Sequence, residues 1–313
     1  MNTPLNAVPE SSIDTIEASE IAPAAVAATR PLYWSIRREL WENSSIYLAP
    51  LIVAVFYLLG LLISVIRIPK TLAALADPVN QRAMIQTPYH VAAFVLLLTA
   101  FFTGAFYCLD ALYGERRDRS VLFWKSLPVS DLTTVLAKAC IPLAILPLIT
   151  FVVILATQIV IFLLSTGFAL GNGLSAAALW AQLPLWKMWI SLLCAIVTSA
   201  LWYAPIYGWL LLVSSYVRRG VFLSAVLPPF AIGVVEKIAF NTHYFSDMIA
   251  FRLTGWYSQA FVPLAPGAVS TADPLTQITL GRFLGSPELW IGLVVTVIFL
   301  AIAVQLRRSR EPI

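Results

Sequence analysis

The sequence predicts an all-α, polytopic membrane protein with six transmembrane helices, and two observations predict this class. Hydrophobic residues make up 60% of the 313 residues and charged residues only 12%, whereas a soluble domain is about half apolar and about a quarter charged. A helix needs about 20 predominantly apolar residues to cross a bilayer, and six stretches meet that requirement. They are residues 46–66, 90–113, 139–168, 188–217, 219–240 and 288–306.

The chain begins with a polar segment, residues 1–29, which is rich in Ala, Ser, Pro and Thr and carries acidic but no basic residues. A secretory signal has a basic start followed by an apolar core, and neither is present here. We therefore predict a disordered cytoplasmic tail. The transmembrane domain is then expected to occupy residues 30–313.

Residues 30–45, directly before the first span, have the pattern of an amphipathic helix. Apolar residues recur there at helical spacing: Leu32, Tyr33, Ile36, Leu40 and Trp41. Charged residues fall between them: Arg37, Arg38, Glu39 and Glu42. This pattern favours a helix lying in the headgroup region, and the alternative is a simple extension of the first span.

The Lys and Arg residues orient the spans. If the amino end is cytoplasmic, most of the 20 basic residues fall on the cytoplasmic side, as the positive-inside rule requires. We therefore predict a multi-pass membrane protein with both termini in the cytoplasm. The same bias explains the net charge of +4 without a nucleic-acid partner.

Residues 113–138, between the second and third spans, hold eight charged side chains: Glu115, Arg116, Arg117, Asp118, Arg119, Lys125, Asp131 and Lys138. The pattern predicts a helix, a break and a second helix, because Pro128 disfavours helix at the residue before it. Ser130 is a suitable N-cap for the second helix. An ordinary solvated loop is the alternative, but such a loop has no reason to expose both Phe123 and Trp124.

The link between spans five and six, residues 241–287, contains a helical pattern with interfacial aromatic residues, so we expect short helices at the outer membrane surface. Prolines inside spans three to five predict kinks. Two acidic residues lie within predicted spans, where an unpaired charge is costly. For Asp110 we expect a structural role, either an ion pair with an arginine or a helix cap. For Glu236 we expect an ion pair, with a place on a substrate path as the alternative.

Two stretches resemble a known family. The sequence GERRDRSVLFWKSLPVSDLTTVLAK (114–138) is similar to the cytoplasmic segment of bacterial ABC-2 type transporter permeases. The sequence RRELWENSSIYLAP (37–50) resembles the amino-terminal stretch of the same family. Outside these stretches the likeness is limited to the number of spans and the long link before the last one.

The resemblance implies that the segment between spans two and three is a coupling helix that docks into a groove on a separate ATPase subunit. Its docking residues would be Phe123, Trp124, Leu127 and Pro128, and its basic residues Arg116, Arg117, Arg119 and Lys125 would pair with carboxylates around the groove. The interfacial helix, with Arg37, Arg38, Glu39 and Trp41, would lie close by. Two permease subunits, identical or paralogous, and two ATPase subunits would form an exporter whose substrate could be a drug, a peptide or a lipid-like molecule.

The chain itself lacks the motifs of an ATP site or a metal site. A P-loop requires GxxxxGK[ST], and neither Lys70-Thr71 nor Lys125-Ser126 follows the necessary glycines. ATP and Mg²⁺ are therefore expected in the partner ATPase, with no cofactor in this chain. The three cysteines and two histidines have no metal-ligand spacing. An ion-coupled secondary transporter is the first alternative function, and a membrane-embedded enzyme is the second.

Overall fold

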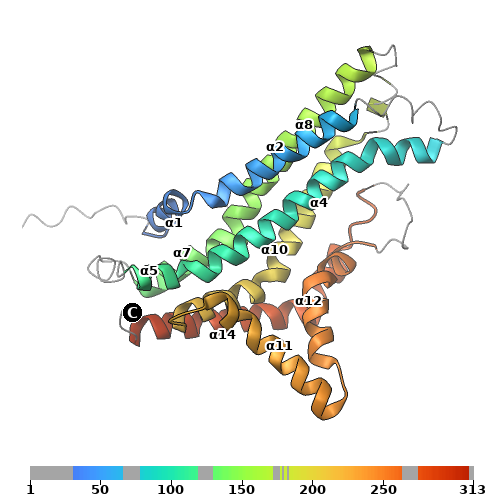
Figure 1. Ribbon diagram of the computed structural model, residues 1–313. Coiled ribbons are helices and arrows are strands. Elements are labelled where there is room, and N and C mark those ends of the chain that lie inside the picture. Colours follow the sequence, from blue (N-terminus) through green and yellow to red (C-terminus); the bar gives the residue numbers. More distant parts are fainter. Residues whose placement is uncertain are drawn as a thin grey trace, which may run out of the picture.

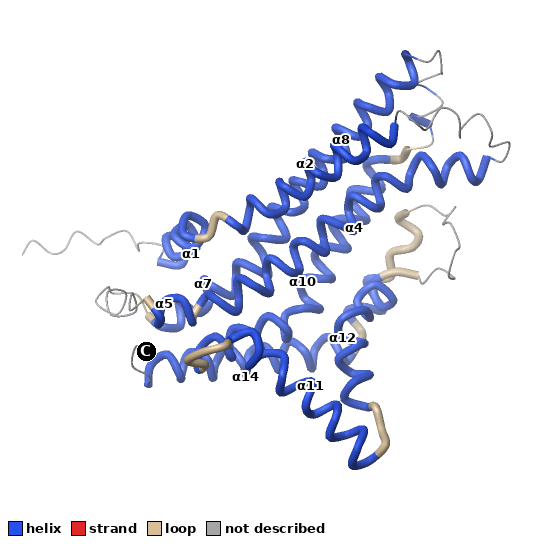
Figure 2. Tube along the Cα trace, in the orientation of Figure 1, coloured by secondary structure: helices blue, strands red, loops and turns tan. Residues whose placement is uncertain are grey.

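The computed structural model describes residues 31–65, 78–118, 130–171, 183–262 and 274–309, together with Ala177, Trp180 and Ala181. Within these ranges every regular element is a helix, and one pair of extended residues, Phe261 and Ile278, forms a β-bridge. Figures 1 and 2 show the arrangement of the helices. The all-α prediction is confirmed for this part of the chain.

Six helical segments are long and apolar enough to cross a membrane, as the sequence predicted. They are α2 (Ser45–Val65), α4 (Pro78–Ala111), the continuous run α7–η1–α8 (Asp131–Gly171), α10 (Leu185–Tyr216), α11 (Val221–Phe240) and α14 (Pro287–Ser309). Helix α4 begins at Pro78, because residues 79–87 contain no glycine or proline to stop it, whereas the candidate span within it begins at Ile85, close to the predicted residue 90. Proline at a helix start is tolerated, since its missing N–H has no helical partner there.

Shorter helices occupy the predicted intervening positions. They are α1 (Pro31–Glu42) before the first span, and α12 (Tyr244–Ala260) and α13 (Leu280–Leu284) between the last two. A further short helix, α5 (Tyr113–Arg117), follows the second span, where a charged turn was expected, and the helix expected around Phe123 and Leu127 lies outside the described residues. Ser130 is the N-cap of α7, and its hydroxyl accepts a hydrogen bond from the Thr133 backbone N–H at 3.1 Å. The predicted restart of the helix at this residue is therefore confirmed.

The third span contains a turn of π-helix, η1 (Ile141–Ile145), between α7 (Asp131–Cys140) and α8 (Leu146–Gly171). Pro142 lies inside η1 and Pro147 directly follows its end. Each proline lacks the backbone N–H that an α-helix would use and disturbs the turn before it. The irregular turn thus forms where the sequence predicted a kink.

The spans form two groups joined by α10. The first group is α2, α4 and α8, and the second is α11 and α14 together with helix α12; Figure 1 shows the two groups diverging toward one side. Helices α2, α4 and α8 pack side by side, while α10 packs against α4, α12 and α14. Helices α11 and α12 form a hairpin that leads away from the first group. We call the end where α1 and α5 lie and α14 finishes the proximal end, and the opposite end of α4 the distal end.

Candidate functional site

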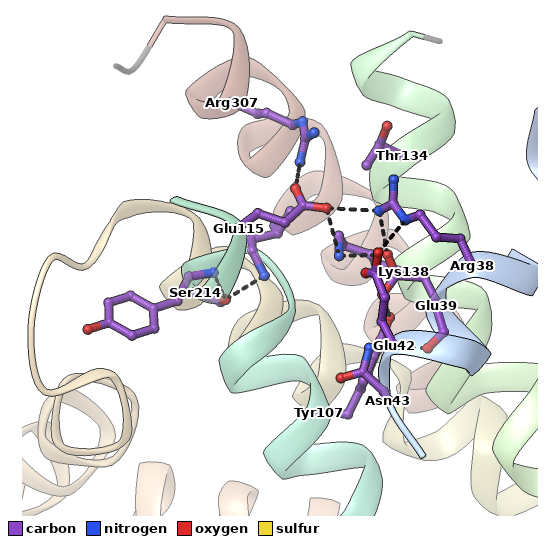
Figure 3. A network of polar contacts seen from close by, with 12 residues as sticks. Arg38, Glu39, Glu42, Asn43, Tyr107, Glu115, Thr134, Lys138, Ser214 and Arg307 are labelled. Atoms are coloured by element: carbon purple, nitrogen blue, oxygen red, sulfur yellow. Dashed lines mark hydrogen bonds and ion pairs between the residues drawn. The ribbon is translucent and has the colours of Figure 1, made fainter. Parts of the chain in front are cut away.

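A network of buried charges joins the helices at the proximal end (Figure 3). Its centre is Glu39 of α1, whose side chain is 1% exposed. Lys138 of α7 donates to Glu39 Oε1 at 2.8 Å, and Tyr107 of α4 donates to Glu39 Oε2 at 2.8 Å. Arg38 Nη2 reaches the same Oε1 at 2.8 Å. One carboxylate therefore connects three helices.

Glu115 of α5 is the second centre of the network. Its Oε1 accepts a hydrogen bond from Arg38 Nη2 at 3.0 Å and lies 3.1 Å from Lys138 Nζ, and its Oε2 accepts one from Arg307 Nη1 at 2.6 Å. Arg307, in the last turn of α14, also donates through Nε to Asp131 Oδ1 at 2.9 Å. The end of the last span is thereby tied to the first turn of α7.

The charges of the network are close to balance, which is what allows them to be buried. Lys138 is 3% exposed, Arg307 7% and Glu115 8%. Burial lowers the pKa of the Arg38 guanidinium, but Glu39, Glu115 and Glu42 together raise it above its usual value. Removing one member of a buried pair leaves an uncompensated charge and typically costs about 3–5 kcal/mol. The charged residues of the network therefore depend on one another, and the loss of one should weaken the contacts between the helices at the proximal end.

Arg116 adds a second fastening, to the end of α10. Its guanidinium donates to the backbone oxygens of Ser214 and Val217, each at 2.7 Å. The Ser214 hydroxyl in turn accepts from the backbone N–H groups of Leu112 and Tyr113 at 3.0 and 2.9 Å. The carbonyl groups at a helix end lack helical partners, and Arg116 supplies donors to them.

These contacts correct two expectations about charged residues. Arg116 was expected to pair with carboxylates of a partner protein, but its side chain is buried and its guanidinium donates to the end of α10. Glu39 was likewise placed on the polar face of an interfacial helix, yet it is one of the most buried residues. A charge can occupy such a position because charges of opposite sign from other helices converge on it.

The network holds both ends of the segment that resembles a coupling helix. Residues 119–129 separate α5 from α7, and Glu115 and Asp131 lie on either side of them. Six residues of the predicted docking surface lie outside the described residues: Arg119, Phe123, Trp124, Lys125, Leu127 and Pro128. Arg117 is described; it is exposed, and its Nε lies 3.0 Å from Asp118 Oδ1.

Some apolar residues of helix α1 pack against the protein core, and others are exposed on the outer surface. Ile36 and Leu40 pack against the buried cluster that contains Tyr107. Trp41, by contrast, is 76% exposed, and the Arg37 guanidinium lies 5.4 Å from the centre of its ring and 5.3 Å from that of Trp34. The apolar residues of α1 are thus shared between the protein core and the outer surface, and the interfacial position of this helix stays a prediction.

The two acidic residues predicted inside spans have different surroundings. Glu236 accepts hydrogen bonds from the Thr242 hydroxyl and the Phe245 backbone N–H, each at 2.9 Å, at the start of α12. A carboxylate is favourable at the positive end of a helix, so Glu236 fixes the turn between α11 and α12. Asp110 is exposed, its carboxylate lies beside Gly114, and it forms no ion pair within the described ranges.

A cavity of about 900 Å³ lies between the two groups of spans. Its walls come from α4, α8, α10 and α12, and Phe261, Pro274 and Gln277 complete them. Most lining side chains are apolar or aromatic, and no charged residue is among those described. Sites for small molecules have this size and character.

Sequence reasoning recognised neither the ion network nor the cavity. A signal for the network existed at Lys138, since Val135 and Ile141 lie three residues before and after it and both are buried. A lysine on an apolar face indicates a buried charge, but nothing local identifies Glu39 and Glu115 as its partners. The cavity has no local signal, because it depends on how separate helices pack.

Comparisons with known proteins found no family model, no curated protein and no solved structure that matches this chain. Conclusions about function are therefore drawn from its own residues and their geometry.

Proposed function

We propose that the chain is the membrane subunit of an ATP-driven ABC exporter of the ABC-2 type. In this proposal two such subunits, identical or paralogous, lie in a bacterial inner membrane with both termini in the cytoplasm. Two copies of a separate ATPase bind ATP and Mg²⁺. Residues 119–129 form the contact with the ATPase, so that nucleotide-driven closure of the ATPases moves the spans.

The observation that carries the proposal is the fastening on both sides of residues 119–129. A force applied to this segment reaches α5 through Glu115 and α7 through Asp131, and both residues bind Arg307 of α14. Lys138 and Arg38 extend the connection to α1. A segment whose ends were held only by solvated loops would bend under load, whereas a buried network of charge-assisted hydrogen bonds is stiff.

The residues available for docking agree with the proposal. Phe123 and Trp124 occur beside Arg119 and Lys125 in the sequence, and aromatic residues with arginine are what protein interfaces enrich. The cavity between the two groups of spans supplies a space whose walls would move with them.

The test requires a candidate ATPase with Walker motifs, sought first in the reading frames next to the gene for this chain. The two proteins are co-expressed and purified, and ATP hydrolysis is measured in lipid nanodiscs. We expect Phe123→Ala with Trp124→Ala to abolish assembly or to remove most of the hydrolysis. Trp186→Ala is the matched control, because Trp186 is exposed but lies at the start of α10. Unchanged assembly and hydrolysis in the double variant would refute the proposal, as would transport that follows an ion gradient without any ATPase.

A further inference from the structure

We propose that the cavity between the two groups of spans binds an uncharged, lipid-like molecule whose polar group hydrogen-bonds to Tyr207. The claim that this molecule is the exported substrate rests on the proposed function. The claim that the cavity binds such a molecule does not. Three features of the cavity support it: its length, its lack of charge, and a tyrosine hydroxyl that faces the cavity and makes no hydrogen bond within the described part of the chain.

The length follows from the helix that forms one wall. The lining residues of α4 run from Gln86 to Phe101, which is about 22 Å at 1.5 Å per residue. This is a large part of the roughly 30 Å hydrocarbon thickness of a bilayer. A cavity of that length, parallel to a spanning helix, fits an extended apolar chain better than a compact polar solute.

The lining excludes charge. The described lining residues include no Asp, Glu, Lys or Arg. Among the lining groups, the Gln158 side chain already has hydrogen-bond partners within the protein. It donates to the backbone oxygen of Tyr89 at 3.3 Å and accepts from the Trp189 indole N–H at 2.9 Å. Thr150 donates to the Leu146 oxygen at 2.8 Å. A charged headgroup inside the cavity would lose its water without gaining a counter-ion, and that transfer is strongly unfavourable.

Tyr207 gives the cavity one specific polar contact. The residue is 4% exposed and lines the proximal part of the cavity, and its hydroxyl makes no hydrogen bond within the described part of the chain. Gly104 allows the close approach of this ring to α4, since a Cβ there would lie 3.2 Å from the hydroxyl oxygen. The hydroxyl is reachable from the cavity, and a tyrosine hydroxyl in apolar surroundings usually has a hydrogen-bond partner. A hydroxyl or carbonyl group on a ligand would satisfy it.

Aromatic rings next to Tyr207 form a wall for the apolar part of the ligand. The Phe101 ring lies 4.8 Å from that of Tyr203 and 6.2 Å from that of Tyr207, measured between centroids. Tyr203 donates to the Leu253 oxygen at 2.9 Å, which fixes its ring against α12. Since α4, α10 and α12 all contribute, a ligand here contacts both groups of spans at once.

The experiment uses photoreactive hexadecanol as the probe and photoreactive hexadecanoate as its charged counterpart, with the purified chain in nanodiscs and no ATPase. We expect hexadecanol to label peptides of α4 and α10 around the cavity, and excess unlabelled hexadecanol to compete. Hexadecanoate should label these peptides much less. Equal labelling by both probes, or labelling spread evenly over lipid-facing helices, would overturn the proposal.

Two variants and one control make the assignment specific. Ala200→Trp fills the cavity and should abolish the labelling, whereas Val152→Trp, on the exposed face of α8, should leave it unchanged. Tyr207→Phe removes only the hydroxyl and should weaken hexadecanol labelling roughly five- to tenfold, as one hydrogen bond implies. Full labelling of Tyr207→Phe would refute the polar contact. Because no ATPase is present, these outcomes are independent of whether the exporter proposal fails.

Discussion

At the proximal end of the bundle the helices are tied to one another by buried charges, whereas farther along α4 and α12 face each other across a cavity. Glu39 and Glu115 bring α1, α5, α7 and α14 together at the proximal end. Around the cavity the lining is mostly apolar and no charged side chain is among the described residues. Charged contacts are directional and lose most of their stabilisation when one partner is missing, while apolar contacts tolerate displacement. The proximal end is therefore held by specific charged pairs, whereas the cavity walls are held by apolar contacts that tolerate small displacements.

The largest effect is expected from breaking the proximal network at its centre. Lys138→Ala leaves Glu39 and Glu115 buried without the ammonium group that binds both, which should cost about 3–5 kcal/mol. Thermal unfolding of the purified protein in detergent measures the loss. Arg117→Ala is the control, because this arginine is exposed and its ion pair is with the exposed Asp118, and such pairs contribute about 1 kcal/mol or less. Equal losses in the two variants would contradict the comparison.

A contact of α12 with α10 and α14 tests whether the cavity side is held more weakly. The Arg252 guanidinium lies 4.6 Å from the Trp202 ring centre and donates to the backbone oxygen of Glu288 at 3.2 Å. It occupies the space beside Gly292, where a Cβ would lie 1.3 Å from Nη2. We expect Gly292→Ala to displace this side chain at a cost of about 1–2 kcal/mol.

A double variant provides the control for this contact. Arg252→Ala removes the displaced group, so adding Gly292→Ala to it should cost almost nothing further. The coupling free energy from the double-mutant cycle is the measurement. Additive losses would show that the guanidinium does not occupy this space.

The N-cap of α7 should show a smaller effect at the proximal end. Ser130 accepts a hydrogen bond from the Thr133 N–H at 3.1 Å, and replacing such a cap with alanine costs about 1 kcal/mol. Ser130→Ala should therefore lower thermal stability less than Lys138→Ala, while Ser130→Asp should retain it. A loss as large as that of Lys138→Ala would mean that the start of α7, rather than the ion network, holds this end together.

The sequence predicted the elements whose causes are local. The six spans follow from apolar length, and the cap at Ser130 and the irregular turn near Pro142 follow from single residues. Charge partners could not be predicted in the same way, because Glu39 and Lys138 are far apart in the chain. Arg116 was therefore expected to pair with a partner protein, and Glu39 was expected on the polar face of its helix. Only the packing of separate helices shows that oppositely charged groups cancel one another and so can be buried.

The smallest expected effect lies at the edge of the network and depends on pH. Burial raises the pKa of Glu42, the nearby Arg38 lowers it in part, and Glu39 raises it further, so that the net shift is upward. An acid with a raised pKa in the folded state contributes stability at pH values below its unfolded pKa, and this contribution is lost as the pH rises through the folded pKa. Glu42→Gln should therefore be slightly more stable than the parent at pH 7 and equal to it near pH 4. Because the side chain is 49% exposed, the gain should stay below about 0.5 kcal/mol after solvent screening.

Unfolding midpoints of the parent and of Glu42→Gln, measured across this pH range, test the prediction. A variant that is less stable than the parent at pH 7 would mean that the ion pair of Glu42 with Arg38 stabilises the folded protein by more than the burial of Glu42 costs.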